Sequence, residues 1–130
     1  MSTIKQFEDL EIWQSARILC QDIHNIITTT SLNNDYKLRD QINSSSGSIM
    51  DNIAEGFERN GKNEFRQFLS IAKGSCGETR SQLYRVFDKK YINQKKFEEI
   101  KEKTFVLSKK LNSFISYLNR SNYDGTKYKK

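Results

Sequence analysis

The sequence contains no proline, only six glycines, two cysteines and one histidine in 130 residues. This composition excludes a collagen-like, proline-rich or linker-like chain, and an aromatic content of 12% argues against a disordered one. No apolar run approaches the roughly 20 residues of a membrane-spanning helix, and residues 1–10 lack the apolar stretch of a signal peptide. We therefore expect a soluble cytoplasmic protein with no membrane partner.

The scarcity of cysteine and histidine also restricts the chemistry available to the chain. Cys20 and Cys76 lie far apart in sequence and match neither a redox motif nor a zinc-binding spacing. The residue three before His24 is Gln21, so the Glu-x-x-His motif of metal sites in helix bundles is absent. The segment 74–77 (GSCG) lacks the lysine of a phosphate-binding loop. We expect no metal site, no cofactor, no catalytic residue and no enzymatic activity.

Four segments carry apolar residues at helical spacing, with turn signals between them. The pattern predicts helices over approximately residues 9–28, 35–59, 65–86 and 93–119. Because short connections join amphipathic helices of this kind, we predict an all-α fold, an antiparallel up-and-down four-helix bundle. Residues 1–120 should form this single domain, and residues 121–130 a basic, flexible C-terminal tail.

The second predicted helix is unusual because small residues occupy its apolar side. Its segment 44–48 (SSSGS) has a poor intrinsic helix propensity, so tertiary packing must hold it helical. Small side chains allow two helix backbones to approach closely. We therefore expect this segment in the tightest packing of the domain or at a contact between subunits.

Several polar residues lie at or beside the apolar sides of the second and third predicted helices. We interpret Asn52, Glu55, Gly74, Ser75 and Glu78 as one structural polar network, in which Gly74 permits close approach and the polar groups pair across it. A catalytic role for the carboxylates of Glu55 and Glu78 is the alternative. We prefer the network because polar groups at helix interfaces more often satisfy one another than perform catalysis.

The charge distribution suggests an interaction with a polyanion. The 22 basic and 16 acidic residues give a formal net charge of +6, and basic residues recur every seven positions beside the third and fourth apolar patterns. The candidate nucleic-acid-binding residues are Arg66, Lys73, Arg80, Lys96, Lys103 and Lys110, together with Lys127, Lys129 and Lys130 of the tail. Such rows can follow a phosphate backbone, and Tyr84, Tyr91 and Tyr117 offer rings for stacking. In the alternative interpretation, these lysines pair with carboxylates of a neighbouring helix.

Three segments of the sequence also resemble a known family. They are residues 7–14 (FEDLEIWQ), 48–56 (SIMDNIAEG) and 65–75 (FRQFLSIAKGS), and the pairing of NIAEG with IAKGS is the specific feature. They resemble the bacterial four-helix bundle proteins encoded in intervening sequences of 23S ribosomal RNA genes. The resemblance implies a ring-shaped homo-pentamer with a basic surface and no enzymatic activity. It also implies a relation to the accessory variability protein of diversity-generating retroelements, which binds a reverse transcriptase and nucleic acid.

Charge placement and resemblance together lead to one functional prediction and one alternative. We predict a non-enzymatic, homo-oligomeric protein that associates with RNA, or with DNA, through basic helix faces. The alternative is an interaction scaffold that docks a protein partner without binding nucleic acid. Salt sensitivity separates the two, because phosphate binding weakens steeply as salt rises.

Overall fold

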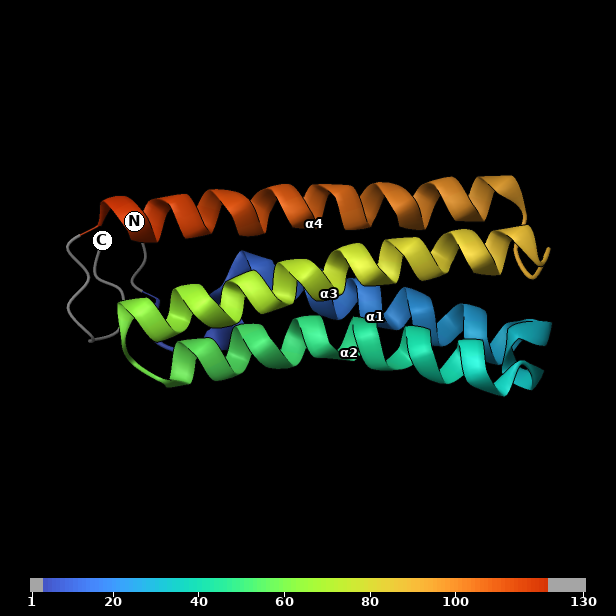
Figure 1. Ribbon diagram of the computed structural model, residues 1–130, viewed down its shortest axis with the longest axis horizontal. Coiled ribbons are helices and arrows are strands. Elements are labelled where there is room, and N and C mark those ends of the chain that lie inside the picture. Colours follow the sequence, from blue (N-terminus) through green and yellow to red (C-terminus); the bar gives the residue numbers. More distant parts are fainter. Residues whose placement is uncertain (1–3, 122–130) are drawn as a thin grey trace.

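A computed structural model describes residues 4–121 of the chain, and within this range the fold is an antiparallel four-helix bundle (Figure 1). Its α-helices are α1 (Glu11–Thr29), α2 (Tyr36–Glu58), α3 (Lys62–Asp88) and α4 (Gln94–Arg120), and residues 4–121 contain no strand. The predicted fold class is therefore confirmed. None of these helices is long and apolar enough to cross a membrane. Of the predicted tail, only Ser121 falls within the described residues.

The helix ends follow the local sequence signals. The Asp35 carboxylate accepts a hydrogen bond from the backbone N–H of Leu38 and caps α2, while the Asn93 side chain accepts one from Lys96 N–H at 2.8 Å and caps α4. After α2, Asn60 adopts a left-handed backbone with φ of 61°, a conformation that asparagine tolerates better than most residues. The break expected between the second and third predicted helices thus falls at Asn60 and Gly61.

Two short 3₁₀ segments flank α1 where the sequence analysis placed a helix start and a loop. η1 (Phe7–Asp9) precedes α1, and the Asp9 carboxylate accepts from the backbone N–H groups of Lys5 and Gln6, so it caps η1 and not α1. η2 (Ser31–Asn34) lies within the predicted loop and buries Leu32 completely. The predicted loop therefore contains a 3₁₀ turn whose Leu32 side chain packs into the core.

The core contains the apolar residues that were expected at the helix interfaces. Cys76 belongs to it, because its side chain is fully buried and its thiol donates a hydrogen bond to the carbonyl oxygen of Thr104 at 3.2 Å. Burial raises the pKa of this thiol to about 11. Cys76 is thus packed as a small core residue, and burial disfavours the thiolate form of its side chain.

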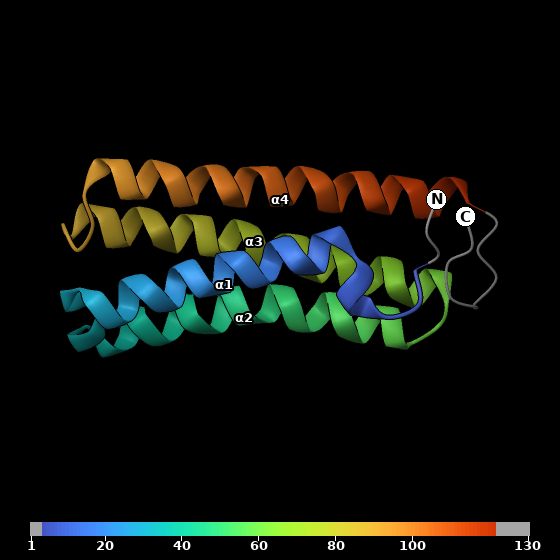
Figure 2. The same ribbon diagram turned by 180° about the vertical axis from the view of Figure 1, so that it is seen from behind.

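The α2 and α3 helices form the most extensive interface of the bundle, and both views show them side by side (Figure 1, Figure 2). Gly56 makes this packing possible, because a Cβ atom at that position would lie 2.7 Å from the Cβ of Phe68. The prediction that Gly74 permits the close approach is wrong. Gly74 is exposed, and a Cβ atom there would meet nothing within 4 Å.

A buried hydrogen-bond network also links α2 to α3, nearer to the N-terminus of α2 than Gly56. The Ser45 hydroxyl lies 2.8 Å from the hydroxyl of Thr79 and 2.6 Å from the side-chain oxygen of Gln82. All three residues are buried, so the small-residue segment packs against α3 at Ser45. The segment as a whole is not the tightest packing of the domain, because Ser44 is exposed, a Cβ atom at Gly47 would meet nothing within 4 Å, and Ser44 and Ser48 line an open pocket of about 380 Å³. Sequence analysis missed Ser45, Thr79 and Gln82 as network members, although Ser45 and Thr79 lie at apolar positions of their helices.

The predicted polar network is correct in part. The Ser75 hydroxyl lies 3.0 Å from that of Ser48, and the Asn52 amide donates to the Ser48 hydroxyl at 2.9 Å, so Ser75 and Asn52 do belong to it. Glu55 does not, because it is exposed and forms an ion pair with Arg59 one turn along α2, at 2.9 Å. Glu78 lies at the rim, exposed, and only accepts a hydrogen bond from the Gln82 amide at 3.4 Å.

Candidate nucleic-acid interface

The lysine row of α4 faces α1, and α1 supplies carboxylates opposite it. Lys103 Nζ lies 2.6 Å from Asp22 Oδ2, and Lys110 Nζ lies 3.0 Å from Glu11 Oε2. Lys110 also donates to the Ser15 hydroxyl at 3.4 Å. We call these five residues the α1/α4 face. Its cations are neutralised within the bundle, as the alternative interpretation of the lysine row proposed.

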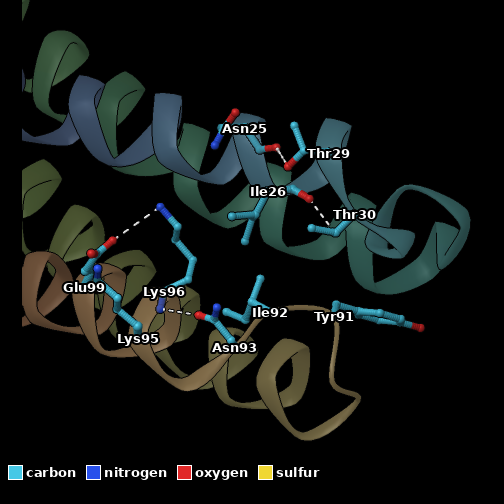
Figure 3. Close-up of a pocket in the computed structure, with 10 residues that line it drawn as sticks. All are labelled: Asn25, Ile26, Thr29, Thr30, Tyr91, Ile92, Asn93, Lys95, Lys96 and Glu99. Atoms are coloured by element: carbon cyan, nitrogen blue, oxygen red, sulfur yellow. Dashed lines mark hydrogen bonds and ion pairs between the residues drawn. The ribbon is translucent and has the colours of Figure 1, made fainter.

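Lys96 extends the same row into an open pocket at the end of the bundle where α1 finishes and α4 begins (Figure 3). The pocket has a volume of about 380 Å³ and is lined by Asn25, Ile26, Thr29, Thr30, Tyr91, Ile92, Asn93, Lys95, Lys96 and Glu99. Lys96 Nζ lies 3.3 Å from Glu99 Oε1, the ion pair drawn in Figure 3. All three lysines of the α4 row therefore have a carboxylate partner.

The basic row of α3 lies at the edge of that helix next to α4 and has a different environment. Arg66 donates to the side-chain oxygen of Asn119 on α4 at 2.7 Å, and the guanidinium of Arg80 lies over the ring of Phe105, 5.1 Å from its centroid. Lys73 occupies the same edge because it is seven residues from each. Within residues 4–121, none of these three cations forms an ion pair with a carboxylate.

Two half-exposed aromatic rings accompany this row. Phe105 is 50% exposed and contacts Lys109 as well as Arg80, with Lys109 Nζ at 5.4 Å from the ring centroid. Tyr84 is 46% exposed, and Lys101 Nζ lies 5.7 Å from its ring centroid. We call the surface formed by the α3 row and these residues the α3/α4 face; its members are Arg66, Lys73, Arg80, Tyr84, Lys101, Phe105 and Lys109.

The charges of the α3/α4 face are only partly compensated. Lys101 forms an ion pair with Glu98 at 3.2 Å, and this hydrogen bond raises the pKa of its ammonium group. The Nη1 atom of Arg80 is buried and has no hydrogen-bond partner among the described residues. A buried donor without a partner costs free energy, so an acceptor that reached this guanidinium would be bound favourably.

The other predicted stacking residues have structural roles. The Tyr91 hydroxyl donates to Asp35 Oδ2 at 2.9 Å, beside Lys89 Nζ at 2.8 Å from the same oxygen. These bonds lower the pKa of Asp35, the Lys89 bond having the larger effect, and raise the pKa of Tyr91. Tyr117 packs edge-on against Phe114, with their centroids 5.6 Å apart. Of the three tyrosines, Tyr84 is the exposed one.

The remaining predictions concern metal ligands and the tail. Within residues 4–121, no three His, Cys, Asp or Glu side chains are placed to hold one metal ion together. His24 is exposed on α1, and Cys20 is half-buried with its thiol donating to the Ser46 carbonyl oxygen. Lys127, Lys129 and Lys130 lie outside the described residues.

A family model described as 23S rRNA-intervening sequence protein matches residues 8–113, most of the chain. The chain belongs to this family. The resemblance found in the sequence is thereby confirmed, whereas the relation to the retroelement accessory protein stays a prediction. The family is named for 23S ribosomal RNA, and an rRNA association is what that name suggests for its members.

The fold of the family is also seen in a solved structure. A protein of unknown function from the S23 ribosomal protein family of Bacteroides thetaiotaomicron is 26% identical to this chain, with a TM-score of 0.72. The match covers 80% of this chain and 97% of that one. No curated protein matches the chain.

Proposed function

We propose that this family member is a non-enzymatic, cytoplasmic protein that associates with RNA through its α3/α4 face. The observation that carries the proposal is the α3 row of Arg66, Lys73 and Arg80, whose charges have no carboxylate partner in the described chain and which lies beside half-exposed rings. Phosphate groups are the ligands that such a row binds best. The family's name refers to intervening sequences of 23S rRNA, which makes RNA the first polyanion to test.

The α4 row is left out of the proposed interface. A phosphate that approached Lys103 or Lys110 would compete with Asp22 or Glu11, which already occupy the ammonium groups at 2.6 and 3.0 Å. The gain from binding would be reduced by the loss of these ion pairs and by repulsion from the freed carboxylates. Lys127, Lys129 and Lys130 remain candidates for additional phosphate contacts.

The residues that looked most like catalytic groups support a non-enzymatic role. Glu55 is engaged with Arg59 on the surface of α2, and Glu78 accepts from the Gln82 amide. Burial raises the pKa values of both thiols, so neither Cys20 nor Cys76 presents the thiolate that a nucleophile requires.

Self-association is part of the proposal, and a homo-pentamer is the assembly that the family resemblance implies. Ile71 on α3 and Ile18 on α1 are half-exposed apolar side chains, the kind of surface that subunit contacts cover. Light scattering coupled to size-exclusion chromatography measures the assembly directly. A mass of one subunit at micromolar concentration would remove self-association from the proposal without affecting the RNA interface.

The experiment that tests RNA association is fluorescence anisotropy of a labelled RNA against the purified protein between about 50 and 200 mM salt. We expect binding that weakens steeply with salt. Lys73→Gln with Arg80→Gln should reduce affinity about tenfold or more and lower the salt slope by about 1.4 for two lost phosphate contacts on a single strand.

The matched control is Lys103→Gln with Lys110→Gln, which removes the same charge from the α1/α4 face. It should change RNA affinity less than about twofold. If the wild-type protein does not bind RNA even at low salt, the proposal is wrong and the scaffold that docks a protein partner takes its place.

A further inference from the structure

The α3/α4 face contains more than cations, and phosphate binding alone leaves the exposed surface of its aromatic rings without a role. Tyr84 packs edge-to-face with Phe97 at a centroid distance of 4.9 Å, and the rest of its ring faces solvent. Phe105 and Tyr84 each expose about half of their surface, although other rings of the same two helices are packed inside. Phe97, for example, is buried and stacks on Phe87 at a centroid distance of 4.5 Å. The two exposed rings therefore lie on a charged surface, where they remain in contact with water.

We propose that Phe105 and Tyr84 are stacking platforms for unpaired bases, so that the RNA bound by this face is single-stranded. The proposal rests on the proposed function, which supplies the RNA, and it adds the class of RNA and the two residues that select it. Cations beside each ring neutralise the phosphates that flank the stacked bases.

The arrangement of the face fits a single strand. Arg80 and Tyr84 are one turn apart on α3, and Lys101 and Phe105 are one turn apart on the antiparallel α4, about 6 Å along the helix axis in each case. Because Arg80 contacts Phe105 and Lys101 contacts Tyr84, the two rings lie at neighbouring levels of the bundle. Rings and cations are therefore interleaved along the face, as in proteins that bind single strands by stacking.

Duplex RNA would gain little from these rings. In a helix the bases are already stacked on one another, and a protein meets mainly phosphates and 2′-hydroxyl groups. An unpaired base has a free π-face that an aromatic side chain can cover, which also removes the apolar ring from water. The structure thus gives single strands an interaction that duplexes lack.

Arg80 takes part in both phosphate binding and base stacking in this proposal. Its guanidinium lies over the Phe105 ring, and its Nη1 is buried without a hydrogen-bond partner among the described residues. Turning this group outward to a phosphate would satisfy the donor and uncover the ring for a base. Lys73, two turns away, would meet the next part of the strand.

The test compares three labelled probes of equal length by fluorescence anisotropy: a single-stranded RNA of about 15 nucleotides, its duplex, and an abasic strand with the same phosphates. We expect the single strand to bind about tenfold tighter than the abasic strand. Phe105→Leu should lose most of that difference and keep the salt slope. Phe105→Trp should restore it, and its new indole should be quenched when RNA binds.

Val106→Ala is the matched control, because Val106 is the neighbouring exposed apolar residue on α4 and lies outside the α3/α4 face. It should leave all three affinities unchanged, and thermal melting should show all variants folded. Equal binding of the abasic and natural strands, or an unaltered affinity in Phe105→Leu, would overturn stacking while leaving phosphate binding intact. If the wild-type protein binds none of the three probes, the proposed function itself is overturned, which is a distinct result.

Discussion

The α1/α4 face and the α3/α4 face contain the same kind of residue at the same spacing and differ in what lies opposite. On the first, Lys103 and Lys110 meet Asp22 and Glu11 of α1. On the second, Arg80 meets the ring of Phe105, and Lys73 has no carboxylate partner in residues 4–121. A heptad row of cations is thus paired with carboxylates in one place and has no carboxylate partner among the described residues in the other.

The difference shows that the neighbouring helix decides the role of a charged row. α1 places acidic residues along its edge toward α4, whereas the edge of α3 toward α4 is itself basic and the facing edge of α4 carries aromatic and basic residues. An ammonium group beside a carboxylate contributes to stability. A cation beside an aromatic ring is not neutralised, so most of its charge remains available to a phosphate group.

Giving the α3 row a carboxylate of its own should produce the largest effect. Ser70 is exposed on α3, four residues after Arg66 and three before Lys73, so Ser70→Glu would form ion pairs with both. We expect a loss of RNA affinity of about tenfold, measured by anisotropy at low salt. Asn43→Glu makes the same charge change on α2 and should have little effect; an equal loss in both variants would mean that only net charge matters.

Removing the carboxylates from the α1/α4 face is the reverse change. Asp22→Asn with Glu11→Gln frees Lys103 and Lys110, and the RNA affinity should rise about threefold with a steeper salt dependence. The same anisotropy titration measures it. An affinity that stays at the wild-type value would show that the position of these lysines, and not their ion pairs, keeps them from RNA.

The two rows should also differ in their contribution to stability. Lys103→Gln breaks a cross-helix ion pair and should lower the free energy of unfolding by about 0.5 kcal/mol, because half-exposed pairs of this kind are screened by water. Lys73→Gln should leave it unchanged. Urea denaturation at low and high salt measures both, and the Lys103 effect should shrink as salt rises. Equal effects of the two substitutions would contradict the assignment of the rows.

The smallest effect is expected in the acid dependence of stability. Lys89 and Tyr91 lower the pKa of Asp35 below its usual 3.8, so the stability from this group is present above that value and is lost as pH falls through the lower, folded pKa. Asp35→Asn should flatten this part of the pH profile in thermal melts taken below about pH 4. A profile with the wild-type slope would show that Asp35 does not carry the effect.

Most of the fold could be predicted from the sequence because the helix signals are local. Apolar spacing predicted the four helices, and the expected boundaries near residues 59 and 93 lie at nearly the same positions in the structure. The two 3₁₀ segments were missed. They depend on hydrogen bonds such as that from Leu32 N–H to the Thr30 hydroxyl and on the burial of Leu32, which a loop-like composition does not reveal.

The site was less predictable because it depends on which helix edges meet. Gly56 and Gly74 both lie in helical segments, so the sequence pattern does not distinguish them. The orientation of α2 relative to α3 places Gly56, and not Gly74, against Phe65 and Phe68. Phe105 was not singled out, since a single exposed ring leaves no periodic pattern. The signal that could have found it is its offset from the apolar positions at Thr104 and Leu107, which places it off the core side of α4.

The hydroxyl cluster of Ser45, Thr79 and Gln82 affects how reliably the bundle finds its alignment during folding. Repeating apolar positions are nearly self-similar, so sliding α3 along α2 by one repeat would again match apolar side chains with apolar side chains. Such a slide would separate the Ser45 hydroxyl from Thr79 and Gln82. The two hydroxyls would keep their bonds to carbonyl oxygens of their own helices, but the buried side-chain oxygen of Gln82 would lose its donor. The cluster therefore marks one repeat as different from the others and raises the energy of misaligned packings relative to the native one.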